Sequence, residues 1–324
     1  MGTTRRHLGF LTAAAAVAAR AHDDEHEPPT ARRAMIHGAV SPLAVAGYRI
    51  GELNRRRLVS ARYLLAFIAL AAGLAAHDLY LRPQTFRPSA GAVFRVEYHN
   101  GDNFPSSEAP AKIERLRDMK LLFPGGETPF AGLRIEGTAT VANVTAPAQP
   151  GNFILISRTI PNFIQLEPAK FEDYLKHEDL TDVIAWRSKR GESGKPGREI
   201  YSKYVKSLGM AVRPSANYGL NAGLTIEFIP LANPYELAPG ATLPVRLLFR
   251  GKPAAGQAVE ASNALGGSVT RARVGRTNAN GEINIPLSGP GLWKLHTILM
   301  ERRADSKAAD WESFWASLTF EIAH

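Results

Sequence analysis

The chain has 324 residues, a formal net charge of +9 at neutral pH and no cysteine. The lack of cysteine excludes disulfides, thiolate zinc sites and cysteine nucleophiles. Residues 1–76 hold 10 of the 39 Lys and Arg residues and 5 of the 30 Asp and Glu residues, so 29 basic and 25 acidic residues remain from 77 onward. This mild excess does not form the basic stripe that a nucleic-acid-binding protein needs, and we expect no nucleic-acid partner.

Residues 53–76 have the build of a secretory signal peptide. Three arginines at 55–57 precede an apolar run that starts at Tyr63, and small residues follow up to Ala76. The run from Tyr63 to Ala76 is about 14 residues, short of the ~20 that span a bilayer. Cleavage after Ala76 leaves His77 as the amino terminus of a periplasmic or secreted protein. A second leader-like stretch near the start indicates that residues 1–52 are a mis-assigned or disposable leader; a tethered amino-terminal anchor is the alternative.

Residues 77–167 predict an N-terminal β domain. Within 93–99, Phe94, Val96 and Tyr98 alternate with polar residues, which is the period of a half-buried strand. Further apolar runs of strand length lie at 120–123, 133–135 and 153–156, with turns at 124–126 and 149–151.

The pattern changes to a helical period at Pro168. Phe171, Tyr174 and Leu175 share one helical face and predict a first helix. A second helix is predicted from Arg198 to Leu208, with Gly209 as its stop. Its apolar stripe would consist of Ile200, Tyr201, Tyr204, Val205 and Leu208. The basic run around these helices is predicted to be a solvated loop; it comprises Arg187, Lys189, Arg190, Lys195 and Arg198.

Strand patterns return from Leu224 onward. Short apolar runs lie at 224–228, 243–249, 258–261, 283–287, 293–299 and 318–322, separated by Gly and Pro turns. Such spacing is typical of an antiparallel sandwich. The predicted fold is therefore mainly β, with two antiparallel β-sandwich-type domains, 77–167 and 223–324, joined by a helical excursion and linker at 168–222.

Several segments resemble one family in their order and spacing. They are Phe171-x-x-Tyr174-Leu175, Arg198 to Leu208, Leu224 to Pro230, Asn233-Pro234-Tyr235, Gly251-Lys252-Pro253 and Asn278 to Gly281. Together they are similar to the family catalogued as domain of unknown function 4198, once mislabelled as a nickel-uptake component, over essentially all of 77–324. The resemblance implies an exported protein with an Ig-like or transthyretin-like carboxy-terminal sandwich. One departure is Asp179, where the family pattern has Gly at the end of the first helix.

Catalytic motifs are absent from the sequence: there is no Gly-x-Ser-x-Gly, no His-Glu-x-x-His and no phosphate loop. Histidine residues are the remaining candidates for a functional site, because a terminal His77 could chelate a metal with both its α-amino nitrogen and its imidazole. His99 or His296 could supply a third nitrogen, and such donors suit copper or nickel. Strand alternation places both on the polar faces of their strands, so we expect them to be accessible. The alternative is that all three are ordinary surface side chains.

Trp311 and Trp315 precede the last predicted strand and are expected to pack in a core, since aromatic residues usually carry packing area. An exposed platform for sugar or peptide is the alternative interpretation.

The favoured function is an exported, non-enzymatic binding or accessory protein that binds a divalent metal through His77 and serves an envelope or membrane transport protein. The alternative is a structural or interaction protein of the envelope with no metal site. A copper-dependent enzyme that cleaves polysaccharide oxidatively is the third hypothesis.

Overall fold

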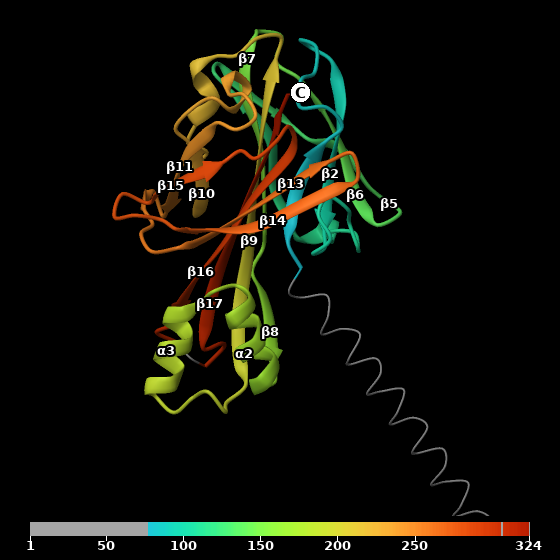
Figure 1. Cartoon of the computed structure of the whole chain (residues 1–324). Helices are drawn as coiled ribbons and strands as arrows, with labels where there is room; N and C mark the ends of the chain where they lie inside the picture. The colour runs from blue at the N-terminus through green and yellow to red at the C-terminus, as the bar shows by residue number, and fades with distance from the viewer. Residues whose placement is uncertain (1–76, 306, 324) are drawn as a thin grey trace, which may run out of the picture. The chain divides into compact units, whose positions relative to one another are not determined.

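The computed structural model describes residues 77–305 and 307–323, which form three β-sheets and two α-helices (Figure 1). The predicted leader and signal peptide lie outside the described residues. The prediction of a mainly β fold with antiparallel sheets and a short helical segment is confirmed. Neither helix of this region is long and apolar enough to cross a lipid bilayer.

The largest sheet takes strands from all three predicted segments. Its order is β14-β13-β16-β17-β9-β7-β3-β4, and β8 pairs with β9. Only β17 and β9 run parallel among these pairs, with Trp311 opposite Glu199. The strands are β3 (Leu116–Phe123), β4 (Gly126–Pro129), β7 (Gly151–Thr159), β8 (Asn162–Leu166), β9 (Gly197–Ala211), β13 (Ala258–Leu265), β14 (Ser268–Arg276), β16 (Gly291–Arg302) and β17 (Trp311–Ile322). Strands on both sides of each predicted boundary, 167 and 223, therefore belong to one continuous sheet.

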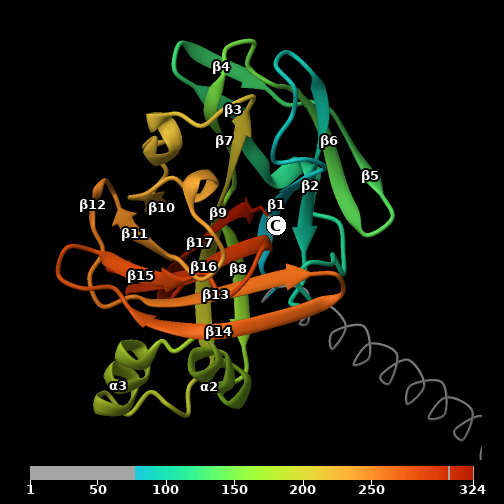
Figure 2. The ribbon, with the colours of Figure 1, turned by 45° about the horizontal axis from the view of Figure 1, so that its top comes forward.

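Two smaller antiparallel sheets complete the β structure (Figure 2). The first has the order β1-β2-β6-β5, and the second joins β10, β11 and β12, with β15 also paired to β11. Their strands are β1 (Leu79–Pro83), β2 (Val93–Asn100), β5 (Ala131–Glu136), β6 (Ala139–Thr145), β10 (Ile226–Pro230), β11 (Thr242–Phe249), β12 (Lys252–Pro253) and β15 (Glu282–Pro286). Short 3-10 turns span Ile113–Arg115, Ala216–Gly219 and Pro234–Glu236.

Each small sheet packs on the central sheet through its own apolar core. The first core joins Val96 and Val144 of the β1-β2-β6-β5 sheet to Phe153 and Leu155 of β7. The second joins residues of β10, β11 and β15 to the apolar face of β9, β16 and β17. Two sandwich-type cores thus share one sheet, and that sheet lies between them.

The first predicted helix is confirmed as α2 (Pro168–His177), with Pro168 in its first turn and Phe171 and Leu175 buried. A helix that the sequence did not indicate, α3 (Thr181–Lys189), follows it. Asp179 between them has a φ of +55°, a conformation that glycine adopts most readily. The glycine that the resemblance implies at this position would adopt this conformation without strain; in this chain the Asp179 carboxylate bonds Arg276 at 2.7 Å. Both helices pack at one end of the long strands β9, β16 and β17 (Figure 1).

The predicted second helix, Arg198 to Leu208, is wrong, because this segment is the 15-residue strand β9. Its residues are buried on both faces, so the polar and apolar alternation that identifies a half-buried strand is missing. Gly209 is not a helix stop: it lies opposite Phe153 in β7. A Cβ at this position would meet the Phe153 ring at 2.3 Å, so the strand needs glycine there for packing.

Of two predictions about side chains, the first is wrong and the second is confirmed. Arg187 is not part of a solvated loop: it is buried in α3, 4.8 Å from the Phe171 ring centroid, and donates to the Lys195 carbonyl at 2.8 Å. Trp311 and Trp315 are buried in the core beneath the helices, which confirms their packing role, although they lie within β17.

Candidate functional site

The strands β9, β16 and β17 have one apolar face and one polar face. Leu295, Phe320 and Tyr204 point into the apolar core. The opposite face carries Lys203 and His296, which are nevertheless buried. This face is the starting point for the candidate site, because buried ionisable groups need partners.

Strand β1 covers part of the polar face. The Ser317 hydroxyl donates to the Leu79 carbonyl at 2.8 Å, and the Thr319 hydroxyl donates to the Leu81 carbonyl at 2.6 Å. These bonds hold the first strand after the predicted cleavage point against β17, although the two strands form no backbone ladder with each other.

Asp78 forms the centre of a buried charged cluster. Its carboxylate bonds the Lys294 ammonium, and its other oxygen lies 3.3 Å from His296 Nδ1. Burial opposes ionisation of Asp78, but His296 and Lys294 outweigh it and hold its pKa well below the ordinary value. The residue next to His77 is therefore fixed as an anion inside the protein.

His296 is buried, with 4% of its surface exposed, so the prediction that it is accessible is wrong. Strand alternation gave its face correctly, but β1 and the end of α2 cover that face. Its second ring nitrogen, Nε2, lies 3.3 Å from Glu178. Burial favours the neutral ring, yet Asp78 and Glu178 together raise the pKa of His296.

His99 is likewise buried rather than accessible, with 5% of its surface exposed. Its Nε2 lies 2.7 Å from Glu97, and its Nδ1 lies 3.3 Å from the Tyr80 hydroxyl. Burial lowers the pKa of His99, and Glu97 offsets only part of this effect. Both nitrogens of His99 are thus engaged, as are both nitrogens of His296.

His77 lies at the edge of the cluster, with partly exposed side chain. Its Nδ1 is 3.2 Å from Asp102 and 3.6 Å from Glu108, and its backbone carbonyl accepts a hydrogen bond from Lys203 Nζ. The three histidines therefore have separate polar partners. Within 77–305 and 307–323, no group of three or more His, Cys, Asp or Glu side chains is arranged to hold a metal ion.

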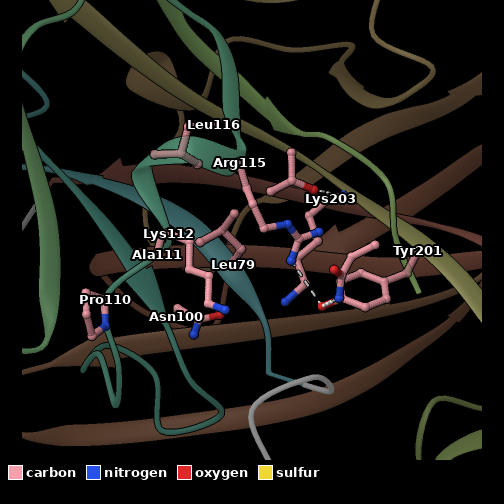
Figure 3. Close-up of a pocket in the computed structure, with 11 residues that line it drawn as sticks. Leu79, Asn100, Pro110, Ala111, Lys112, Arg115, Leu116, Tyr201 and Lys203 are labelled. Carbon is pink, nitrogen blue, oxygen red and sulfur yellow. Dashed lines mark hydrogen bonds between the residues drawn. The ribbon is translucent and has the colours of Figure 1, made fainter. Parts of the chain in front are cut away.

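Beside His77 lies a pocket of about 260 Å³ (Figure 3). Its polar wall includes Lys112, Arg115, Tyr201 and Lys203, which come from the turn before β3 and from β9. Burial lowers the pKa of Lys203 to about 8. Lys203 therefore keeps its positive charge at neutral pH, and the pocket has a cationic wall.

Glu199 lies four residues before Lys203 on β9 and is also buried. Burial raises its pKa to about 7, although hydrogen bonds from the hydroxyls of Ser313 and Tyr174 lower it in part. Because burial raises this pKa, Glu199 compensates the charge of Lys203 less than an ordinary carboxylate would.

The sequence analysis singled out His77 but not Asp78, Arg115 or Lys203, which lie near it in the structure. Lys203 was assigned to a predicted helix, so its position on a strand of the central sheet was not predicted. A usable signal was present: charged residues such as Lys203 and Lys206 interrupt a long apolar segment. The partner of Lys203 is His77, 126 residues away in the chain, and the local pattern does not contain so distant a contact.

Solved structures similar to this chain include an Intimin fragment and two adhesins. The D0-D1 domain of Intimin is 12% identical, with 76% of this chain and 98% of that chain covered and a TM-score of 0.20. The Escherichia coli adhesin FdeC is 12% identical, with 78% and 65% covered and a TM-score of 0.21. The Yersinia pseudotuberculosis adhesin InvE is 10% identical, with 76% and 59% covered and a TM-score of 0.21. TM-scores this low support no inference about this chain.

No curated protein matches the sequence. A family model does match: that of a domain of unknown function, DUF4198, aligns with residues 74–301. The match covers most of the chain and confirms the resemblance drawn from its motifs. This chain is a member of the DUF4198 family.

Proposed function

We propose that this chain is an exported, non-enzymatic binding or accessory protein of the bacterial envelope, and that its mature amino-terminal residue, His77, binds a divalent transition metal such as copper or nickel. The observation that carries the proposal is the position of His77. Its carbonyl is bonded to Lys203, and its Nδ1 faces Asp102 and Glu108.

The chemistry needs a free α-amino group on His77. Cleavage after Ala76 would create it next to Nδ1, so that one residue offers two nitrogen donors. The carboxylates of Asp102 and Glu108 lie close to this imidazole and would balance the charge of the ion. His99 and His296 could join only by breaking their present hydrogen bonds, so the proposal depends on His77.

The first test is the identity of the mature terminus, read by mass spectrometry of the protein recovered after export. Calorimetric titration of Cu(II) and Ni(II) into a 77–324 chain that begins at His77 then measures affinity. A matched protein with one alanine before His77 serves as the control. Submicromolar binding confined to the native terminus supports the proposal; equal, weak binding in both proteins refutes it.

A second candidate, an envelope interaction protein without a metal site, is favoured by one observation. Leu265 and Val269 on the β13–β14 hairpin are 37% and 47% exposed, beside an open cleft of about 800 Å³. Such apolar exposure suits contact with a protein partner. Recovery of an envelope or membrane transport protein with the wild type, and its loss after Val269→Lys, would favour this function over metal binding.

A further inference from the structure

Three lysines are buried in the part of the chain that the structure describes, and they differ in how their charge is compensated. Lys206 bonds Glu227 at 2.7 Å, and Lys294 bonds Asp78. Lys203 has no carboxylate within ion-pair distance among the described residues; its ammonium donates to the His77 carbonyl. Burying an unpaired charge is costly, so the exception calls for an explanation.

The acidic groups near Lys203 form their ion pairs and hydrogen bonds with other residues. Asp78 is held by Lys294 and His296, and Asp102 lies against His77. Glu199 accepts hydrogen bonds from Ser313 and Tyr174 and is partly protonated at neutral pH. Each acts on Lys203 only from beyond 4 Å, so none of them forms an ion pair with its ammonium.

Lys203 lines the pocket of about 260 Å³ together with two other cations, Lys112 and Arg115 (Figure 3). None of the eleven lining residues is acidic. Arg115 donates to the Tyr201 hydroxyl at 3.2 Å and to the Ile160 carbonyl at 2.9 Å, while its buried Nε has no hydrogen-bond partner. Among the described residues, none of these three cations thus has a carboxylate within ion-pair distance, and Lys203 contacts the rings of Tyr201 and Trp315 instead.

Tyr201 adds a neutral donor to this wall. Its hydroxyl oxygen accepts from Arg115 Nη1 at 3.2 Å and from the Asn162 amide at 2.9 Å. With both bonds accepted, the phenolic O–H remains free to donate. Lysine, arginine and a polarised hydroxyl together form a donor set for an oxyanion.

The rest of the lining has an apolar part and an uncharged polar part. The apolar part consists of Leu79, Pro110, Ala111 and Leu116, and the polar part of Asn100, Thr159 and Asn162. The volume lies just below the range usual for drug-sized ligands, so the pocket suits a small molecule. We propose that it binds a small anion, with a carboxylate or phosphate group against Lys203 and Arg115 and a short apolar part against Leu79 and Leu116. This inference goes beyond the proposed metal function and does not depend on it.

The test is calorimetry and thermal unfolding of the full-length protein in metal-free buffer at constant ionic strength. The probes are inorganic phosphate, succinate and butyrate, with butylammonium as the cationic counterpart of butyrate. We expect at least one anion to bind and raise the melting temperature, and butylammonium to do neither. Preference for phosphate or for a carboxylate identifies the oxyanion. No binding by any of the three anions, or binding of butylammonium as tight as that of the best anion, would overturn the proposal.

Variants locate the binding. Lys203→Met should weaken anion affinity roughly ten- to hundredfold, as expected for loss of a charge-assisted hydrogen bond. Lys252→Met removes the same charge from the exposed strand β12 of another sheet and should leave affinity unchanged. If Lys203→Met does not fold, Lys112→Glu at the exposed rim provides the measurement, because it places a carboxylate at the pocket. Equal weakening by Lys252→Met, or none by the pocket variants, would contradict binding at this site.

Discussion

The buried carboxyl of Glu199 allows a quantitative test of how charge is arranged beneath the pocket. It is 2% exposed, and burial raises its pKa to about 7, against an ordinary value of 4.5 in the unfolded chain. The folded protein therefore binds more protons than the unfolded chain between these two pH values. The contribution of Glu199 to stability is fully present below pH 4.5 and is lost as pH rises through 7.

The size of the effect follows from the difference between the two pKa values. From 4.5 to about 7, that difference corresponds to a loss of about 3 kcal/mol once the carboxyl is ionised in both states. Glutamine at position 199 keeps the shape and an acceptor oxygen for Ser313 and Tyr174 but cannot ionise. The stability of Glu199→Gln relative to wild type should therefore improve by about 2 kcal/mol between roughly pH 5 and pH 7.5.

Urea unfolding followed by circular dichroism at a series of pH values measures this difference. Glu167→Gln makes the same chemical change at an exposed position and subtracts the general effect of losing a carboxylate. A stability difference between Glu199→Gln and wild type that stays constant across this pH range would refute the reasoning. Glu199 would then be ionised at neutral pH, and its negative charge could compensate the positive charge of Lys203.

Two further predictions concern the packing of β9. Gly209→Ala should destabilise the fold by about 1–3 kcal/mol in urea unfolding, because the new methyl meets the buried Phe153 ring, whereas Gly194→Ala, with open space around it, should cost far less. Equal costs would argue against the observed pairing of β7 and β9. Glu227→Gln should cost about 3–5 kcal/mol, since it leaves the buried Lys206 ammonium without its carboxylate. A change below about 1 kcal/mol in the same assay would show that the ion pair does not stabilise the fold.

The parts of the fold that the sequence predicted are those where one face of an element meets water. In β2, Phe94, Val96 and Tyr98 are buried and Arg95 and Glu97 are partly exposed, so alternation identified the strand. Helix α2 buries Phe171 and Leu175 on one side only, and its helical period was readable. Strand β9 was not identified as a strand, because both of its faces are covered and its sequence does not alternate. Its apolar residues matched a helical stripe by chance.

The site was predicted only in part for a related reason. Strand alternation assigned His296 to the face opposite Leu295, which is correct, but it does not show whether another element covers that face. Here β1 and the end of α2 cover it, so a residue expected at the surface is buried in ion pairs with Asp78 and Glu178. Contacts between residues 78 and 296 depend on the order of strands in the sheet, which a local pattern does not determine.

The two faces of the central strands therefore serve different physical purposes. The apolar face gains most of its stability from burial, with Leu295 and Phe320 among its fully buried residues, and its one buried lysine, Lys206 on β9, is paired with Glu227. On the polar face, buried charge gives little net stability even when it is paired, as in Lys294 with Asp78. Retaining an unpaired Lys203 on that face is less favourable still, unless a bound anion supplies the missing partner. The placement of this one cation beside a pocket without acidic residues is the reason to look for a ligand there first.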